Sequence, residues 1–295
     1  MHLARAVVAA GSVAGSVISV VVPVRNGMPW LEDQLRALVD QECAGEWEVL
    51  VVDNGSTDES PTVGRGWAHR SAVVRWMDAS GIRGPGAARN AGVREARGDL
   101  LAFCDADDVV RPGWLSAVAS ALEDADLAAG VFDFWSLNGR PASTLQPAAT
   151  RQLGFLPAGL GANLGVRRHA FEAVGGFAEE LSIGEDIDLC WRLQLRGFRF
   201  EVASDAVVAK REHPGFAGAF RHGTAYGLSG PALFRRHRAD GARPDLRGAA
   251  RSWLWLIVRA PLLLRRTDLR DQWAHAAGVR TGRLRGSIRE RVFFP

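Results

Sequence analysis

Three aspartates within four residues could bind a metal ion. Asp105, Asp107 and Asp108 directly follow the apolar run Leu100–Cys104, which is typical of a buried strand. Three carboxylates this close repel one another, so we expect a positive charge to offset them. Carboxylate oxygens are ligands that Mg²⁺ and Mn²⁺ prefer, and such an ion could bridge to a diphosphate. A structural alternative is that Asp108 caps a helix opening near Pro112 while the other two aspartates are solvated.

A second polar group follows the apolar run Trp47–Val52. Asp53 and Asn54 stand at the exit of this expected strand, where both side chains could hydrogen-bond the edge of a nucleotide base. The residues that follow indicate a turn and the start of a helix, which Ser56 or Thr57 could cap. Helix capping would explain Ser56 and Thr57, but it would not explain Asp53 and Asn54 at the exit of the strand.

A glycine-rich segment, Gly84–Asn90, only loosely matches a dinucleotide-binding fingerprint. It contains G-x-G but carries arginine where the third glycine belongs, and it follows the third expected strand, not the first. The segment better fits a flexible loop that ends in a helix, whose Arg89 could contact a phosphate.

An acidic segment, Gly184–Leu189, begins a helix that we expect to run to about Arg196. Glu185, Asp186 and Asp188 fall in its first turn. The helix dipole stabilises an acidic residue in the first turn by about 0.3–1 kcal/mol, and this effect alone would explain the presence of any one of the three. A general base held rigidly at a helix N-terminus would show the same pattern, so both interpretations stay open.

The elements that must position these groups alternate between apolar strands and amphipathic helices. Expected strands are Ser16–Val24, Trp47–Val52, Val73–Met77, Leu100–Cys104 and Leu127–Phe134. Leu31, Leu35, Leu38 and Val39 share one face of an intervening helix. This alternation predicts a parallel sheet covered on both faces, with ligands bound beyond the carboxyl ends of the strands. Residues 136–160 are expected to form a loop region beside the site, and His213 follows the strand-like stretch Ala203–Ala209 as either a structural residue or a ligand.

Taken in order, these segments resemble the family 2 glycosyltransferases, which have the GT-A fold. The matching motifs are SVVVPVRN (Ser19–Asn26), VVDNGSTD (Val51–Asp58), GAARNAG (Gly86–Gly92), DADD (Asp105–Asp108), GANLGVRR (Gly161–Arg168), VGGF (Val174–Phe177) and GEDIDL (Gly184–Leu189). The resemblance covers about residues 17–215. It implies a Rossmann-like α/β fold, with a mixed, mainly parallel sheet sandwiched by helices. A C-terminal helical extension is expected to follow.

The resemblance also implies roles for particular residues. The nucleotide and donor would contact Pro23, Arg25, Asp53, Asn54, Arg89 and Asp105. Asp105 and Asp107 match the DXD metal motif, with Asp107 as the direct ligand of Mg²⁺ or Mn²⁺ and His213 as a possible further one. Asp186, in the pair with Glu185, would be the catalytic base. The implied reaction is inverting transfer of a sugar from a nucleotide donor, UDP-sugars being favoured, to a hydroxyl of a glycan or lipid-linked acceptor in cell-envelope or polysaccharide biosynthesis.

Charge divides the chain into an acidic body and a basic tail. Residues 1–209 hold 18 basic and 27 acidic residues, a net −9, whereas residues 210–295 hold 18 basic and 6 acidic, a net +12. Only one of the 36 basic residues, Lys210, is a lysine, which excludes a P-loop and disfavours Schiff-base chemistry. The apolar run Trp253–Leu264 is too short and interrupted to cross a bilayer but suits a helix lying on an anionic membrane surface. Its alternative is a helical layer packed on the catalytic domain.

These features divide the chain into three regions. We expect a disordered extension at residues 1–16, a catalytic domain at 17–215 and a basic helical extension at 216–295. A signal peptide is the alternative for the uncharged N-terminal stretch Ala6–Val24. Three widely spaced cysteines indicate a reducing compartment, so we expect a cytoplasmic protein, peripheral at the inner face of the cell membrane.

Two other functions compete with glycosyl transfer. A non-catalytic nucleic-acid-binding protein could use the arginines and tryptophans of the tail, but the acidic body would repel a polyanion and we expect no nucleic-acid partner. A dinucleotide-dependent oxidoreductase is disfavoured by the incomplete and misplaced glycine motif.

Overall fold

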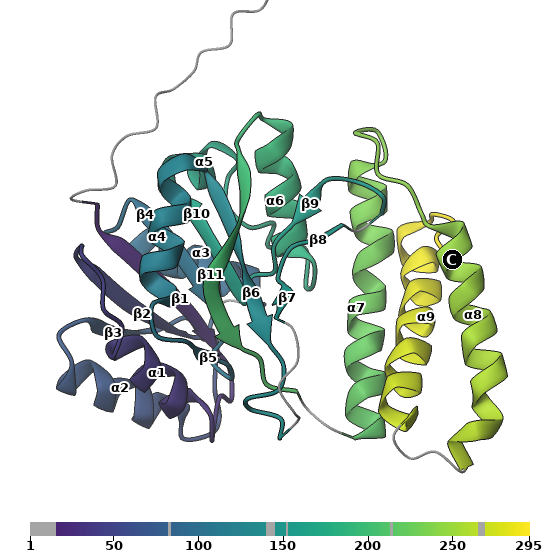
Figure 1. Ribbon diagram of the computed structural model, residues 1–295, viewed down its shortest axis with the longest axis horizontal. Helices are drawn as coiled ribbons and strands as arrows, with labels where there is room; N and C mark the ends of the chain where they lie inside the picture. Colours follow the sequence, from purple (N-terminus) through teal and green to yellow (C-terminus); the bar gives the residue numbers. More distant parts are fainter. Residues whose placement is uncertain (1–15, 82–83, 140–144, 152, 213–214, 265–268) are drawn as a thin grey trace, which may run out of the picture.

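The computed structural model describes residues 16–81, 84–139, 145–151, 153–212, 215–264 and 269–295. Within them, nine strands form one sheet in the order β3-β2-β1-β4-β10-β6-β11-β5, with β7 paired to β6 (Figure 1). These strands are β1 (Ile18–Val24), β2 (Trp47–Asp53), β3 (Val74–Asp78), β4 (Leu100–Cys104), β5 (Val109–Val110), β6 (Leu127–Asp133), β7 (Gln146–Pro147), β10 (Asn163–Arg167) and β11 (Phe200–Ala209). A separate pair consists of β8 (Thr150–Arg151) and β9 (Pro157–Ala158).

The strand directions confirm the expected mixed sheet. Strands β3, β2, β1 and β4 run parallel to one another, and β6 and β11 form a second parallel pair. Between these groups, β10 runs antiparallel to both β4 and β6. The carboxyl ends of β1, β2 and β4 therefore meet at one edge, and the polar motifs that follow these strands converge there.

Helices cover both faces of the sheet (Figure 1). They are α1 (Leu31–Val39), α2 (Ser60–Arg70), α3 (Pro85–Glu95), α4 (Trp114–Asp124), α5 (Arg168–Ala173) and α6 (Glu185–Leu195). In α3, a Cβ on Gly92 would press on Val21 of β1, whereas Gly165 of β10 makes room for Val118 of α4. Because side chains alternate along each strand, the paired register places Val21 and Gly165 on opposite faces of the sheet. The valine-rich strands are therefore buried on both sides.

Three longer helices follow β11 and lie side by side at one end of the molecule (Figure 1). They are α7 (Phe216–His237), α8 (Leu246–Arg259), which continues into the short 3₁₀ helix η1 (Ala260–Leu264), and α9 (Arg270–Glu290). This arrangement confirms the expected C-terminal helical extension. The proposed division at residues 215 and 216 stays a prediction, and residues 1–15 of the expected N-terminal extension lie outside the described residues.

Glycines let the backbones of α7 and α9 touch. They recur at spacings of four residues on the facing sides of the two helices: Gly223 and Gly227 on α7, and Gly278, Gly282 and Gly286 on α9. A Cβ on Gly227 would collide with the carbonyl oxygen of Val279, and a Cβ on Gly282 with that of Thr224. Small residues at this spacing are a general means of bringing two helices close together. We call this contact the glycine interface.

A buried carboxylate joins α7 to the sheet domain. Asp188 of α6 is fully buried and accepts hydrogen bonds from Arg192 Nε at 2.6 Å and His237 Nε2 at 2.8 Å. It also forms an ion pair with Arg236, whose Nε lies 2.8 Å from Oδ1. Burial alone would raise the pKa of Asp188, but His237 and Arg192 hold it below its usual value. Losing either α7 partner would leave part of this charge unpaired, so Asp188 anchors the helical extension to the helix that carries Asp186.

Replacing Gly227 with alanine should destabilise the protein, although alanine normally favours a helix by about 0.5–1 kcal/mol. The added Cβ meets backbone, which cannot move aside as a side chain can, so we expect a net loss of about 1–3 kcal/mol in the free energy of unfolding. Urea unfolding followed by circular dichroism measures it.

Gly66→Ala is the matched control, because a Cβ at this position in α2 would contact only the end of the Arg70 side chain at 3.8 Å. We expect Gly66→Ala to be neutral or stabilising. Equal effects of the two substitutions would contradict the proposed role of the glycine interface.

Candidate active site

A cleft of about 420 Å³ opens at the carboxyl ends of β1, β2 and β4. Its lining is formed by Pro23, Val24, Arg25, Asn26, Gly27, Trp30, Asn54, Gly84, Pro85, Asp105, Ala106 and Asp107. Five residues expected from the sequence are among them: Pro23, Arg25, Asn54, Asp105 and Asp107. This is the edge at which parallel-strand geometry predicts a ligand site.

The loop after β1 is tied to the loop after β2. Asn26, whose backbone has φ of 55°, donates its N–H to Ser56 Oγ at 2.9 Å and accepts from the Thr57 N–H at 2.7 Å. Helix α2 begins only at Ser60, and neither Ser56 nor Thr57 caps it, so the capping alternative for these residues is wrong. Asp53, at the end of β2, is buried and accepts a hydrogen bond from the Ser56 N–H at 3.0 Å.

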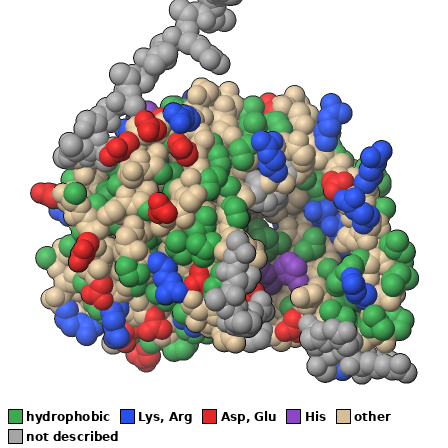
Figure 2. Space-filling model, viewed as in Figure 1, with side chains coloured by type: hydrophobic (Ala, Val, Ile, Leu, Met, Phe, Trp, Pro, Cys, Tyr) green, Lys and Arg blue, Asp and Glu red, His purple; other side chains and the backbone are tan. Residues whose placement is uncertain are grey.

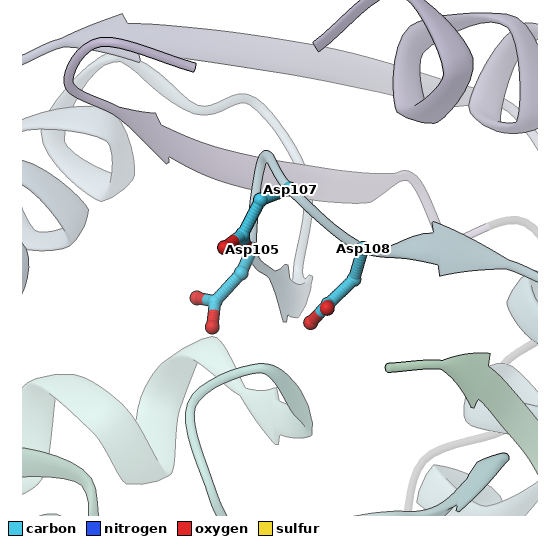
Figure 3. Close-up of side chains that lie close together, drawn as sticks. All are labelled: Asp105, Asp107 and Asp108. Atoms are coloured by element: carbon cyan, nitrogen blue, oxygen red, sulfur yellow. The ribbon is translucent and has the colours of Figure 1, made fainter. Parts of the chain in front are cut away.

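The acidic cluster, Asp105, Asp107 and Asp108, points to one side of its loop (Figure 3). One carboxylate oxygen from each lies within 4.8 Å of the others. Asp108 does not cap α4, which begins at Trp114 after Gly113 and has no side-chain cap, so this structural alternative is wrong. The three carboxylates supply hard oxygen donors at a spacing that suits a divalent cation, and Asp105 and Asp107 also line the cleft.

Gln34 of α1 holds the loop of the acidic cluster in shape. Its Nε2 donates to the Asp105 carbonyl oxygen at 2.9 Å, and its Oε1 accepts from the Val110 N–H at 3.0 Å. Because Gln34 is fully buried, this double contact fixes the loop from beneath.

The only lysine of the chain lies beside the acidic cluster. Lys210 Nζ is 2.7 Å from Asp108 Oδ2 and 3.2 Å from Asp105 Oδ2. Burial alone would lower the pKa of Lys210, but Asp105 and Asp108 hold it well above its usual value. Lys210 therefore supplies the positive charge that the three aspartates led us to expect. The sequence motifs did not identify Lys210 as a residue of the site, and its being the sole lysine of the chain was the one feature that singled it out.

Arg89 connects the acidic cluster to the start of α6. Its guanidinium is buried and donates from Nη2 to Asp105 Oδ1 at 2.9 Å and from Nη1 to Glu185 Oε1 at 2.8 Å. Burial and the neighbouring Asp186 raise the pKa of Glu185 to about 7, against the opposing effect of Arg89. Arg89 thus lies behind the cleft, and Glu185 is held by this ion pair.

Asp186 is half-buried in the first turn of α6, and both of its carboxylate oxygens are held by backbone. Oδ2 accepts from the Gly161 N–H and Oδ1 from the Ile187 N–H, each at 2.8 Å. Burial raises the pKa of Asp186 above its usual value. These contacts fix the direction of the carboxylate, as proton transfer from a bound substrate requires.

One face of α7 approaches the same region. Its buried residues Ser229, Leu233 and His237 pack toward α6, where a Cβ on Gly184 would lie 3.1 Å from both Ser229 and Leu233. Toward the start of α7, the same face continues with Tyr226 and His222, both exposed, whose ring centroids are 4.4 Å apart. Figure 2 shows histidine side chains beside a hollow between the sheet domain and the helices.

Tyr226, the only tyrosine of the chain, is thus a second residue that motif reasoning missed. Although 42% of Tyr226 is exposed, desolvation of its hydroxyl raises the pKa of that group, and so do Asp186, Asp105 and Glu185, whereas Lys210 lowers it. Asp105, Lys210 and the acidic first turn of α6 therefore act electrostatically on a side chain of the helical extension. His213, the further metal ligand expected from the resemblance, lies outside the described residues.

Comparison with known proteins identifies the family. Residues 19–173 match the family described as glycosyl transferase family 2, and residues 100–274 match glycosyl transferase family group 2. The chain belongs to the family 2 glycosyltransferases. Its membership confirms the resemblance inferred from the motifs and disfavours the oxidoreductase and nucleic-acid-binding alternatives.

Among named relatives, the pre-mycofactocin glycosyltransferase of Mycobacterium tuberculosis is 28% identical over 82% of this chain and 52% of its own length. Glycosyltransferase AglE of Haloferax volcanii is 29% identical over 67% of each protein. The chain thus spans only about half the length of the mycobacterial relative.

Two solved structures share the fold. The Pyrobaculum calidifontis mannosyltransferase PcManGT, in complex with GDP-Man and Mn²⁺, aligns with a TM-score of 0.61 at 18% identity, covering 90% of this chain and 87% of that one. Residues 1–349 of S. aureus TarS, in complex with UDP-GlcNAc, align with a TM-score of 0.55 at 19% identity, covering 94% and 93%. Both likenesses confirm the GT-A fold.

Replacing Arg89 with methionine should destabilise the protein in a pH-dependent way. Glu185 would lose its buried counter-charge, so we expect a loss of about 3–5 kcal/mol in the free energy of unfolding near pH 8. The folded-state pKa of Glu185 is already raised, so protonation at pH 5 removes the unpaired charge and the loss should be smaller there. Urea unfolding at both pH values measures the difference.

The double variant Arg89→Met/Glu185→Gln should show little of this pH dependence, because no carboxylate remains at position 185. The same loss at pH 5 and pH 8 in the single variant would contradict the assignment of the effect to Glu185.

Proposed function

We propose that the chain transfers a sugar from a nucleoside-diphosphate donor to an acceptor hydroxyl with inversion at the anomeric carbon. The observation that carries the proposal is the single network in which Arg89 links Asp105, at the cleft, to Glu185, next to Asp186. One set of ion pairs therefore fixes the donor side and the base side relative to each other. Family membership supports the reaction type.

The donor would bind along the cleft. Pro23, Arg25 and Asn54 line it and would contact the nucleotide, with Asp53 supporting them from beneath. UDP-sugars are the favoured donors, and the TarS complex with UDP-GlcNAc supports this preference. The PcManGT complex, which contains GDP-Man, makes guanine nucleotides the alternative to test.

Asp107 and Asp105, which line the cleft, would hold Mg²⁺ or Mn²⁺. The carboxylate donor set fits such an ion, and the Mn²⁺ in the PcManGT complex supports its presence in this fold. When bound, the ion would offset the negative charge that develops on the departing diphosphate.

Asp186 would act as the base. The acceptor oxygen forms a bond to the anomeric carbon, its proton passes to the Asp186 carboxylate, and the bond to the diphosphate oxygen breaks with its electron pair leaving on the phosphate. Because Asp186 has a raised pKa, transfer should fall as the pH drops through a value above the usual aspartate range. The acceptor, a glycan or a lipid-linked sugar, would approach from the side of α7, where Tyr226 and His222 lie.

One set of measurements separates the donor site from the base. We expect a nucleotide sugar at ~100 times its Kd to stabilise the wild type by about 2.7 kcal/mol in Mn²⁺, and less in EDTA. Thermal unfolding with UDP-, dTDP- and GDP-sugars identifies the nucleotide. Asp107→Ala should lose the metal-dependent part of the stabilisation.

Asp186→Asn is the matched variant for the base. It keeps an oxygen to accept from the Gly161 N–H but cannot take a proton, so donor stabilisation should persist while sugar transfer falls to background. Loss of donor binding in Asp186→Asn, or transfer at the wild-type rate, would contradict the proposal.

We further propose that α8 rests on an anionic membrane surface. Leu254, Ile257 and Val258 share one face of α8 and are 61–67% exposed, which is unusual for three adjacent large apolar side chains. The C-terminal part of the chain is strongly basic, and Figure 2 shows basic and hydrophobic side chains together on the surface over α8. None of the described helices has both the length and the apolar character that crossing a bilayer demands. An acceptor attached to lipid would meet the enzyme at such a surface, at the inner face of the cell membrane.

Sedimentation with vesicles tests this placement. The wild type should bind vesicles that contain phosphatidylglycerol more tightly than purely phosphatidylcholine vesicles, and Leu254→Gln/Ile257→Gln should weaken binding by at least about tenfold. The control Leu195→Gln/Val202→Gln changes two exposed apolar residues of the sheet domain and should bind normally. Normal binding by the α8 variant would contradict the proposal.

A further inference from the structure

Lys210 occupies the position of a counter-ion within the acidic cluster. Its ammonium contacts Asp108 Oδ2 and Asp105 Oδ2, while the remaining oxygens of these two carboxylates accept from the Arg211 N–H at 2.9 Å and from Arg89 Nη2 at 2.9 Å. Both oxygens of two of the three aspartates are therefore already paired with donors of the protein. A divalent cation entering here would share these carboxylates with a fixed positive charge.

The position of Lys210 is fixed by its backbone. Its N–H donates to the Asp133 carbonyl oxygen at 2.8 Å, and its own carbonyl oxygen accepts from Asn138 Nδ2 at 2.8 Å. The next residue, Arg211, donates from Nε to the Asp107 carbonyl oxygen at 3.0 Å. The end of β11 is thus bonded to the loop of the acidic cluster, so the ammonium is held close to it.

This arrangement changes the electrostatics of metal binding. A divalent cation that shared Asp105 and Asp108 with Lys210 would be repelled by the ammonium, and partial burial of these groups strengthens the repulsion relative to water. A nucleoside diphosphate brings negative charge that attracts both the cation and the lysine. The cation and the diphosphate should therefore bind well together, whereas the cation alone should bind poorly.

We propose that Lys210 makes metal binding conditional on the nucleotide: the acidic cluster admits a divalent cation only together with the donor diphosphate. Lys210 is thus a positioning residue that acts through Asp105 and Asp108. The inference rests on the proposed function, because it requires the metal and the nucleotide to share the cleft.

Titration with Mn²⁺, followed by the electron paramagnetic resonance signal of free Mn²⁺, tests the inference without measuring activity. In the wild type, saturating UDP should raise Mn²⁺ affinity by at least about tenfold, and Mn²⁺ should raise UDP affinity by the same factor. In Lys210→Met, the affinity for Mn²⁺ alone should rise by at least about tenfold, and the effect of UDP should shrink.

Two charge controls accompany this variant. Lys210→Arg keeps the positive charge and should behave as the wild type. Arg199→Met removes a positive charge from an exposed side chain just before β11, at the opposite end of that strand from Lys210, and should also leave Mn²⁺ binding unchanged. Because methionine leaves Oδ2 of the buried Asp108 without its hydrogen-bond donor, Lys210→Gln serves as a second variant that lacks the charge but can still donate.

The outcomes separate this inference from the proposed function. If Mn²⁺ binds the wild type with UDP, but neither Lys210→Met nor Lys210→Gln binds Mn²⁺ alone more tightly than the wild type, the role of Lys210 is overturned and the metal site stands. If Mn²⁺ does not bind the wild type even with UDP, the metal part of the proposed function fails and the inference fails with it.

Discussion

The ion pairs of Arg89 are the contact on which the geometry of the site depends. A guanidinium presents donors in a rigid plane, so the two bonds that it makes also set the distance between their acceptors. Here the acceptors are Asp105, at the end of β4, and Glu185, at the start of α6, which are 80 residues apart in the chain. The pair with Glu185 is buried on both sides, which makes its disruption costly, whereas Asp105 is 30% exposed at the cleft.

The helical extension shares this rigidity because it is attached at α6. Asp188, two residues beyond Asp186, pairs with Arg236 and His237 of α7, and Gly184 on the other side packs against Ser229 and Leu233. The first turn of α6 is therefore linked to Asp105, at the cleft, through Glu185 and Arg89, and it binds the extension through Asp188. The position of Arg89 behind the cleft and the placement of α7 depend on the same short segment.

Much of the architecture was predictable from local patterns. The apolar runs that predicted strands correspond to β1, β2, β3, β4 and β6. Of these, β1, β2, β4 and β6 are almost wholly buried, and strands covered on both faces of a sheet are predominantly apolar. The edge strand β3 is only partly buried. The polar residues at the carboxyl ends of β1, β2 and β4 were likewise predicted to line one site, since topology alone brings these ends together. Arg25, Asn54, Asp105 and Asp107 do line the cleft.

What the sequence could not predict depends on contacts between distant segments. Ser56 was a plausible helix cap by spacing, but its hydroxyl accepts from Asn26, a residue of another loop. The counter-charge for Asp108 comes from Lys210, which no local pattern connects to it. In the same way, nothing in the periodicity of α7 indicates that the face carrying Tyr226 approaches Asp186, because that approach is set by the docking of the whole helix.

The glycine interface restricts which amino-acid substitutions this protein can accept during evolution. Every other amino acid has a Cβ, so any missense mutation in the codons of Gly227 and Gly282 inserts an atom where two backbones already touch. A core leucine can be exchanged by a single mutation for methionine or isoleucine, which have a similar volume. No amino acid other than glycine has a volume that fits this contact. A side chain larger than glycine in this contact would require α7 and α9 to move apart. Because α7 is bonded to α6, that movement would displace the segment that carries Asp186. In a library of all single substitutions, the line of contact between α7 and α9 should therefore stand out by depletion, although it contains no reactive group.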